Sequence, residues 1–236
     1  MYACLKPSDE SLTEQIVKNV NKTIQIEFCH LSTVVSNIEH MPRSIAIKAK
    51  KQAIAEYRNQ LLTQYLDQEI TDADVLRTSY GKPYLKDHAQ FYFNHSHSQH
   101  YYALATSQRY ADLGIDIEEL SRNVRFDALA QHAFHPNELQ KWQDSDFDKS
   151  YWFKVWTTKE AVLKASGLGI RINLNEFDTQ VHLIHDGGMC QHPSIGQFAY
   201  QNMQVGDVML TVAWAAEASC KGFNFPKIEL HSTFAK

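Results

Sequence analysis

The sequence predicts an α+β fold made of two similar α/β lobes in tandem. Three observations point to this class. Several short segments alternate apolar and polar residues, which is typical of strands. Two long segments carry apolar residues at spacings of three and four, which is typical of helices. Each half of the chain also runs as strand, long helix and then strands. We therefore expect an N-terminal lobe over residues 1–112 and a C-terminal lobe over residues 113–236.

Composition limits the class of protein. The 236 residues are 44% hydrophobic and 21% charged, close to the averages of soluble globular proteins. The net charge of -4 argues against nucleic-acid binding by general phosphate neutralisation. We find neither a signal peptide nor an apolar run of the ~20 residues that a membrane span needs. The four cysteines are widely spaced, which favours reduced thiols. We expect a cytoplasmic protein that binds neither nucleic acid nor membrane.

The N-terminal half is expected to begin with a strand over residues 24–29, IQIEFC, which alternate in polarity. Residues 45–66 predict a long helix with one buried stripe. Gly81 and Pro83 then mark a turn, and the strand-like segments QFYFNHSHS and YYALATS follow it. The expected stripe of the helix consists of Ile47, Ala53, Ile54, Tyr57, Leu61, Leu62 and Tyr65.

The C-terminal half opens with another short strand, LGIDIEEL, at residues 113–120. Pro136 suits the first turn of a helix in HPNELQKW. Residues 151–166 give the strongest helix signal in the chain, and Gly167 and Gly169 are expected to end that helix. The segments FDTQVHLI, IGQFAYQN and VMLTVAWAA predict the strands of a closing sheet.

Two carboxylates share one face of the strand at residues 113–118. Side chains alternate along a strand, so Asp116 and Glu118 lie on the same side, with Cα atoms about 6.6 Å apart. Two carboxylates at that spacing are able to converge on one hard cation such as Mg²⁺. Taken alone, the pattern favours an exposed strand face.

A third carboxylate lies on the long helix of the C-terminal half. Glu160 falls on one line with Trp156 and Lys164, at spacings of four residues. A carboxylate beside an aromatic seam can join a metal site or act as a base with a raised pKa, and a nearby lysine can neutralise phosphate. Taken alone, the spacing of Glu160 and Lys164 favours an ordinary surface pair on a helix.

Three histidines, His95, His97 and His100, lie within FNHSHSQH at residues 93–100. Imidazole is a common metal ligand, so zinc is the first hypothesis to test. A zinc site needs further ligands with supporting hydrogen bonds, and the sequence offers no such residues nearby. We therefore do not expect a zinc site at these histidines.

Four stretches together resemble a known family. YGKPYL, FNHSHS, GIDIE and WTTKEAVLKASGLG, in this order and at these separations, are similar to 4'-phosphopantetheinyl transferases of the surfactin-synthetase-activating (Sfp-like) type. The similarity runs from about residue 43 to residue 178. It implies two lobes related by a pseudo-two-fold, with coenzyme A phosphate and nucleotide contacts in the N-terminal lobe and the metal-binding, catalytic helix in the C-terminal lobe.

The resemblance implies an activity and its ligands. Such enzymes transfer the 4'-phosphopantetheine arm of coenzyme A to a serine of an apo acyl or peptidyl carrier protein and release adenosine 3',5'-bisphosphate. The carriers serve siderophore and other nonribosomal peptide, polyketide or fatty-acid synthesis. Mg²⁺ is required, and Mn²⁺ is an alternative. Because both halves of the site lie in one chain, we expect a monomer.

The resemblance also implies roles for individual residues. The metal ligands are Asp116, Glu118 and Glu160, and the catalytic residues are Glu160, Lys164 and Asp116. Glu160, directly or through a water, would deprotonate the serine, while Lys164 would hold the diphosphate. The remaining coenzyme A contacts would be Gly81, Lys82, Pro83, Ser96, His97 and, at the 3'-phosphate, Arg58.

The chain departs from the family pattern at a few places. Gln99 and His100 stand where members commonly have glycine, so the shape of that turn is open. Lys48 and Lys51 are weaker candidates than Arg58 for phosphate contacts, because their spacing fits the family less well. In FHPNEL, Phe134 is expected to pack internally and Glu138 to lie near the carrier-protein surface.

Two other functions fit part of the pattern. A metal-dependent phosphohydrolase would use the same three carboxylates, but it leaves the Gly-Lys-Pro loop unexplained. A non-catalytic module that binds coenzyme A or a carrier would tolerate the loss of the Glu160 carboxylate.

Overall fold

The structure is a computed structural model that describes residues 22–35, 40–169, 171–219, 222–223 and 225–233. It is α+β, as the sequence predicts, with two four-stranded sheets. The first sheet has the order β12 (Lys227–Thr233), β1 (Thr23–His30), β5 (Tyr101–Ser107) and β4 (Tyr92–His97). The second has the order β6 (Leu113–Glu119), β9 (Val208–Ala215), β8 (Gly196–Val205) and β7 (Gly187–His192).

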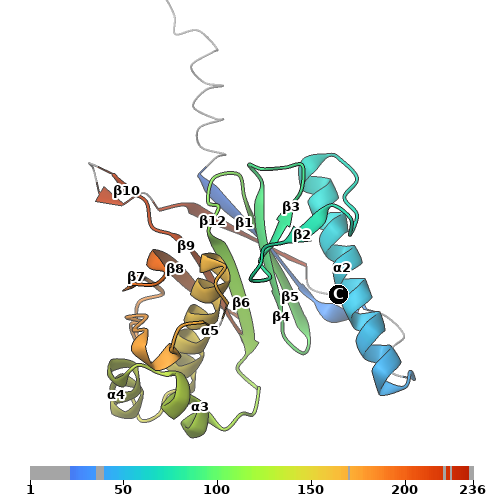
Figure 1. The fold of residues 1–236 in the computed structure, drawn as a ribbon. Coiled ribbons are helices and arrows are strands. Elements are labelled where there is room, and N and C mark those ends of the chain that lie inside the picture. The colour runs from blue at the N-terminus through green and yellow to red at the C-terminus, as the bar shows by residue number, and fades with distance from the viewer. Residues whose placement is uncertain (1–21, 36–39, 170, 220–221, 224, 234–236) are drawn as a thin grey trace, which may run out of the picture.

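Helices and short elements complete the fold (Figure 1). The helices are α2 (Arg43–Leu66), α3 (Phe126–Ala133), α4 (Pro136–Asp144) and α5 (Lys149–Ser166), with 3-10 turns η1 (Leu31–Thr33) and η2 (Leu174–Glu176). The short strands form two pairs, β2 (Val75–Arg77) with β3 (Pro83–Leu85), and β10 (Ala218–Ser219) with β11 (Gly222–Phe223).

The elements form four layers, in which the two sheets face each other and one long helix covers each outer face (Figure 1). Apolar side chains of β1 and β5 meet those of β6 and β9 between the sheets. α2 packs on the other face of the first sheet, and α5 packs on the other face of the second. Residues Leu113, Ile115 and Ile117 of β6 point between the sheets, so Asp116 and Glu118 lie on the side of α5.

The two sheets share a strand order. β1 pairs with the second strand of the hairpin β4–β5, and β6 pairs in the same way with β9 of the hairpin β8–β9. A long helix, α2 or α5, lies between the first strand and the hairpin in each case. β12 breaks this correspondence, because it comes from the C-terminal end of the chain and pairs in parallel with β1.

The helix expected over residues 45–66 is present as α2, but the expected stripe is only partly buried. Ile45 and Ile47 are 52% and 48% exposed, so the prediction that Ile47 is buried was wrong. Burial begins at Ile54, where α2 packs against β5. A helix that projects past its sheet keeps its apolar spacing without burying it, as the N-terminal turns of α2 do in Figure 1.

One predicted strand is absent. FDTQVHLI, residues 177–184, forms no strand pair. Phe177, Thr179 and Val181 are nevertheless fully buried, while Asp178 and Gln180 are more exposed. The alternation therefore reflects an extended segment packed on helices rather than a place in a sheet. The other predicted strands and the helices at residues 136–144 and 149–166 are confirmed.

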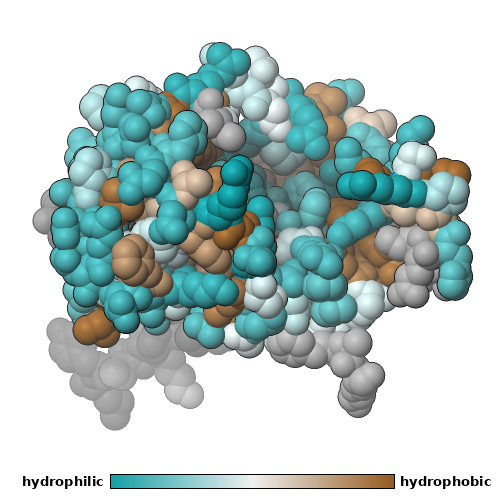
Figure 2. Space-filling view, turned by 90° about the horizontal axis from the view of Figure 1, so that it is seen from below, coloured by the Kyte–Doolittle hydropathy of each residue, from teal (hydrophilic) through white to brown (hydrophobic). Residues whose placement is uncertain are grey.

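Apolar side chains are scattered over the face of the molecule that Figure 2 shows. Figure 2 shows a face that is mostly hydrophilic, with scattered hydrophobic residues. Ile45, Ile47 and Phe147 are among the exposed large hydrophobic side chains. Within the described ranges, none of the helices combines the length and apolar character needed to span a bilayer.

Gly114 sets how closely α5 approaches β6. A Cβ atom at this position would lie 2.1 Å from the carbonyl oxygen of Ala161 and 2.4 Å from the backbone nitrogen of Ala165. Both are backbone atoms of α5, so a side chain can be accommodated only if the helix moves. The glycine of GIDIE is thus a packing requirement that places α5 beside the carboxylates of β6.

We expect Gly114→Ala to lower the free energy of unfolding by about 1–3 kcal/mol or more, because it overpacks this contact. Urea unfolding measures the change. Gly206→Ala serves as the comparison, since Gly206 has a φ of 63° but no atoms within 4 Å of the position that a Cβ atom would take, so it reports backbone strain alone. A loss smaller at Gly114 than at Gly206 would show that α5 has room to shift.

Candidate active site

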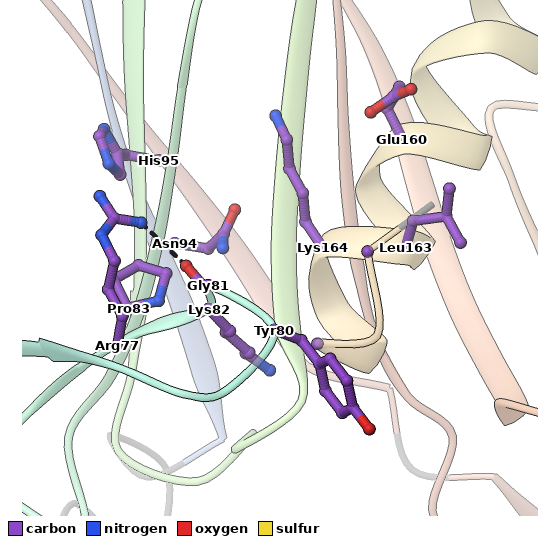
Figure 3. A pocket seen from close by; sticks show the side chains of 12 residues that line it. Arg77, Tyr80, Gly81, Lys82, Pro83, Asn94, His95, Glu160, Leu163 and Lys164 are labelled. Atoms are coloured by element: carbon purple, nitrogen blue, oxygen red, sulfur yellow. Dashed lines mark hydrogen bonds between the residues drawn. The ribbon is translucent and has the colours of Figure 1, made fainter. Parts of the chain in front are cut away.

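A pocket opens where the β2–β3 turn and β4 meet α5 (Figure 3). Arg77 and His95 lie on one side of it, and Lys164 and Glu160 lie on the other. Five of the lining residues were predicted from the sequence, namely Gly81, Lys82, Pro83, Glu160 and Lys164. Arg77, Tyr80, Asn94 and His95 also line the pocket and were not predicted to do so.

Three predicted site residues from three elements meet beside this pocket. The Lys164 Nζ atom on α5 donates hydrogen bonds to Asp116 Oδ1 on β6 at 2.7 Å and to Ser96 Oγ on β4 at 2.9 Å. Ser96 Oγ also donates to Asp116 Oδ1, at 2.9 Å. Asp116 is only 6% exposed, so the lysine balances a carboxylate that is largely removed from water. The strands and the helix are thereby joined at one carboxylate oxygen.

Asn94 reinforces the alignment of β4 with β6. Its side-chain oxygen accepts a hydrogen bond from the backbone nitrogen of Ile115 at 3.1 Å. β4 and β6 belong to different sheets, so this contact holds the edges of the two sheets in register. The N-x-S-H stretch marks Asn94 in the sequence, but only the fold shows that it binds the backbone of β6.

The other two acids carry raised pKa values. Burial raises the pKa of the Glu160 carboxyl, and the negative charge of Asp116 raises it further. The pKa of Glu118 is raised for the same two reasons, although its ion pair with Arg122 opposes the effect. The Asp116 carboxylate thus disfavours the ionised forms of Glu160 and Glu118. A bound cation would reverse this repulsion.

The donor set fits a hard cation chemically, although the three acids do not converge in this conformation. Asp116 Oδ2 is buried and has no hydrogen-bond partner among the described residues, which leaves one carboxylate oxygen available. Carboxylate oxygens are the ligands that Mg²⁺ prefers. In the part of the chain that the structure describes, no three His, Cys, Asp or Glu side chains lie close enough to hold a metal ion. Ligation by Asp116, Glu118 and Glu160 stays a prediction.

The turn after β4 is attached to β6 through Glu119. This carboxylate accepts hydrogen bonds from Ser98 Oγ at 2.5 Å and from the backbone nitrogen of His100 at 2.8 Å. His100 Nδ1 lies 2.7 Å from its other oxygen. The turn that carries Gln99 and His100 in place of glycine therefore has a buried anchor, and Glu119 is a residue that sequence reasoning missed. His97 lines the groove beside this turn, and burial lowers its pKa.

Lys82 binds the end of α5 instead of projecting freely into the pocket. Its Nζ atom donates to the carbonyl oxygen of Ala165 at 2.6 Å and lies 3.5 Å from Asp112 Oδ1. Gly81 has a φ of 90°, which only glycine adopts readily. The Gly-Lys-Pro loop thus joins the first half of the chain to α5, and its role in binding nucleotide stays a prediction.

Arg58 is buried and already paired. Its Nη2 atom lies 2.7 Å from Asp72 Oδ1 and 2.7 Å from Asn59 Oδ1. It is 5% exposed and does not line the pocket beside Lys164. The structure therefore places Arg58 inside a polar cluster on α2, and it gives no direct support for a contact with phosphate.

Glu138 lies in the interior, so the expectation that it sits near a surface was wrong. It is fully buried, and its Oε2 atom forms an ion pair with Lys159 Nζ at 2.8 Å. The capping arrangement at the start of α4 turns this side chain inward, because Oε2 also accepts from the backbone nitrogen of His135. Phe134 packs against Trp142 and Trp152, as expected.

Comparison with known proteins links the chain to one family. Residues 112–213 match the family model described as the 4'-phosphopantetheinyl transferase superfamily. The chain is 33% identical over 150 residues to 4'-phosphopantetheinyl transferase gsp of Aneurinibacillus migulanus, which covers 55% of this chain and 60% of that protein. It is 37% identical over 116 residues to 4'-phosphopantetheinyl transferase HetI of Nostoc sp., a match that covers 47% of this chain and 48% of that protein. It is also 30% identical over 105 residues to 4'-phosphopantetheinyl transferase Sfp of Bacillus subtilis, a match that covers 44% of this chain and 45% of that protein.

The chain spans 60% or less of the length of each of these relatives. The family match nevertheless contains β6 with Asp116 and Glu118, and α5 with Glu160 and Lys164. These two elements are in close backbone contact at Gly114, and they carry the three carboxylates of the site. Over residues 112–213 the chain is therefore similar to the 4'-phosphopantetheinyl transferase superfamily, and the relatives with which it aligns are 4'-phosphopantetheinyl transferases.

Proposed function

We propose that this protein transfers the 4'-phosphopantetheine arm of coenzyme A to a serine of an apo acyl or peptidyl carrier protein. The products are the holo carrier protein and adenosine 3',5'-bisphosphate. The observation that carries the proposal is the meeting of Ser96, Asp116 and Lys164 beside a pocket that Glu160 also lines. A lysine, a hydroxyl and clustered carboxylates suit phosphoryl transfer, which depends on positioning and charge stabilisation.

Each residue has a distinct task in this reaction. Lys164 Nζ would hold the diphosphate and stabilise the charge that develops on the departing phosphate. Glu160, whose pKa is raised by burial and by Asp116, would accept the proton of the carrier serine, directly or through a water. Mg²⁺ or Mn²⁺, held by Asp116, Glu118 and Glu160, would offset the negative charge of the diphosphate.

The proposal also covers the lobes of the chain, its oligomeric state and its location in the cell. We propose two lobes, residues 1–112 and 113–236, related by a pseudo-two-fold, and the shared order of β1–β5–β4 and β6–β9–β8 supports it. The pocket combines residues of both halves of one chain, which supports a monomer. We propose a cytoplasmic enzyme whose carriers belong to siderophore, nonribosomal peptide, polyketide or fatty-acid synthesis.

The direct test is a mass measurement on carrier proteins. We expect several apo acyl and peptidyl carriers, incubated with the protein, coenzyme A and Mg²⁺, to include at least one that gains a single phosphopantetheine. Intact-mass spectrometry reads the gain, and chelation of the metal should abolish it. Failure with every carrier tested would contradict the proposal.

A parallel reaction without carrier distinguishes the other functions. Cleavage of coenzyme A or a simple phosphoester in the absence of any carrier would indicate a phosphohydrolase. Binding of coenzyme A or carrier with neither cleavage nor transfer would indicate a non-catalytic module.

A further inference from the structure

We infer that Glu119, the last residue of β6, is a positioning residue for the transfer reaction. It holds the turn at residues 98–100, and with it His97 at the end of β4, in a fixed place relative to the carboxylates of β6. The inference rests on the proposed function and gives a role to a side chain outside the predicted site. Three observations carry it: a row of contacts between β4 and β6, the burial of the Glu119 carboxylate, and the face of β6 on which it lies.

Side chains at every second position of β4 and of the turn after it contact β6. Asn94 binds the backbone of β6, and Ser96 Oγ donates to Asp116 Oδ1 at 2.9 Å. Ser98 Oγ continues this row and donates to Glu119 Oε1 at 2.5 Å. Alternate side chains of a strand share one face, so the three contacts follow the line along which the two sheets meet.

The turn is held by both halves of the chain. From the N-terminal half, Lys50 Nζ donates to the carbonyl oxygen of Gln99 at 2.9 Å. The backbone nitrogen of Leu31 donates to the carbonyl oxygen of His100 at 2.6 Å. Among the described residues, the hydrogen bonds that join the turn to the C-terminal half all end on Glu119. Without this carboxylate the turn would stay attached to α2 and η1 but would no longer be fixed against β6.

Both oxygens of Glu119 are engaged by the turn, and the residue is only 6% exposed. Oε1 accepts from Ser98 Oγ and from the backbone nitrogen of His100, and Oε2 lies 2.7 Å from His100 Nδ1. Hydrogen bonds to an ionised carboxylate are stronger than those between neutral groups. Moving the turn away would leave a buried charge without its donors, so the carboxylate fixes the position of the turn.

Glu119 lies apart from the groups that would contact substrate. It falls on the face of β6 that includes Ile117, which points between the sheets and away from α5. It lines the groove beside His97 but not the pocket beside Lys164. The contact between Lys164 and Asp116 would change when a diphosphate binds, whereas the contacts of Glu119 would persist. Glu119 therefore keeps the two walls of the site in register while the other polar groups change partners.

We expect Glu119→Ala to lower kcat/KM for coenzyme A by about tenfold or more, because phosphoryl transfer depends on precise positioning. Glu119→Gln should restore most of the rate, since its carbonyl oxygen still accepts from Ser98 and from the backbone of His100. Ser98→Ala removes one contact and leaves the carboxylate its other donors, so the loss should be smaller, about threefold. Rates of holo-carrier formation at varied coenzyme A measure these effects, and thermal unfolding checks that each variant is folded.

A double-mutant cycle with His97 separates positioning from a general loss of stability. If Glu119 acts through His97, Glu119→Ala should change kcat/KM by less than about twofold in a His97→Ala background. The full tenfold loss in that background would show that Glu119 acts independently of His97, and the inference would be wrong. Should Glu119→Ala fail to fold, Ser98→Ala takes its place in the same cycle.

Glu217→Ala is the matched control. Glu217 also joins distant segments of the chain, through Arg109, but it lines neither the pocket nor the groove, so the rate should match wild type. A wild-type rate with both Glu119→Ala and Ser98→Ala would overturn the inference while the proposed function stands. If the wild-type protein modifies no carrier, the proposed function fails, and the inference fails with it.

Discussion

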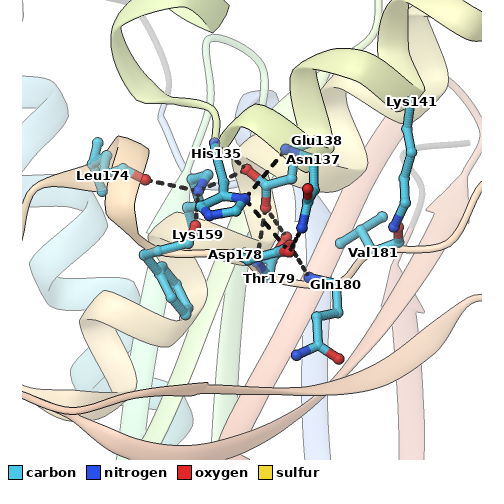
Figure 4. A network of polar contacts seen from close by, with 11 residues as sticks. His135, Asn137, Glu138, Lys141, Lys159, Leu174, Asp178, Thr179, Gln180 and Val181 are labelled. Atoms are coloured by element: carbon cyan, nitrogen blue, oxygen red, sulfur yellow. Dashed lines mark hydrogen bonds and ion pairs between the residues drawn. The ribbon is translucent and has the colours of Figure 1, made fainter.

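Replacing Glu138 by glutamine is expected to lower the free energy of unfolding by about 3–5 kcal/mol, because it leaves the charge of Lys159 buried without its partner. Lys159 is 1% exposed and Glu138 is fully buried. The lysine also donates to the carbonyl oxygens of Leu174 and Phe177, so the pair joins α4 and α5 to η2 and to the residue that follows it (Figure 4). Chemical denaturation measures the change.

A double-mutant cycle separates the ion pair from its surroundings. Lys159→Met alone should also be strongly destabilising, because it leaves the Glu138 carboxylate buried without its cation. The combined variant, Glu138→Gln with Lys159→Met, removes both charges and keeps an acceptor for Thr179. It should therefore be less destabilised than the sum of the two single changes. Additive losses would mean that the two charges do not stabilise each other.

An exposed ion pair provides the reference for this cycle. Arg109 and Glu217 are 37% and 38% exposed at their side chains and 2.6 Å apart. Arg109→Ala should cost only about 0–1 kcal/mol, since solvent screens such a pair. A loss of similar size at Glu138 would show that the interior pair is better solvated than its burial indicates.

Replacing Glu160 by glutamine is expected to slow phosphopantetheine transfer by about a hundredfold or more, the range for loss of an acid–base group. Glutamine keeps the size of the side chain but neither accepts a proton nor carries charge for a cation. It also removes repulsion with Asp116 and Glu118, which raises the Glu160 pKa in the wild-type protein. The folded state should therefore be no less stable than wild type. Rates of holo-carrier formation and thermal unfolding measure the two effects.

The control for this change is Glu56→Gln. Glu56 lies on the exposed side of α2, where it accepts a hydrogen bond from Gln52, so the same chemical change occurs away from the pocket. Transfer by this variant should match wild type, while Glu160→Gln still binds coenzyme A in part. An unchanged transfer rate with Glu160→Gln would remove this residue from the catalytic set.

Local sequence patterns were reliable for isolated elements. α5 begins at an aspartate cap and ends at Gly167, which adopts a φ of 71°. The strand β6 was predicted from alternation, which also placed Asp116 and Glu118 together on one face of the strand. These features depend on neighbours within a few residues, so the chain specifies them locally.

Pairing between distant segments was not predictable in the same way. β12 joins β1 across about two hundred residues of sequence, and no local pattern marks that register. The segment at residues 177–184 alternates because its apolar side chains pack on helices, a cause that periodicity cannot distinguish from a sheet.

The candidate site likewise combines features that local sequence predicted with contacts between distant segments that it did not predict. The sequence by itself determined that carboxylates, a lysine and a Gly-Lys-Pro loop occur on a strand, a helix and a turn. Only the tertiary structure decided which basic groups remain available, since it paired Arg58 with Asp72 and left Arg77, at the pocket, with no ion-pair partner among the described residues. It also placed Glu138 inside, against Lys159. The physical reason is that residue type sets what a side chain can do, whereas burial and the nearest opposite charge, contributed by distant segments, decide whether it is free to do it.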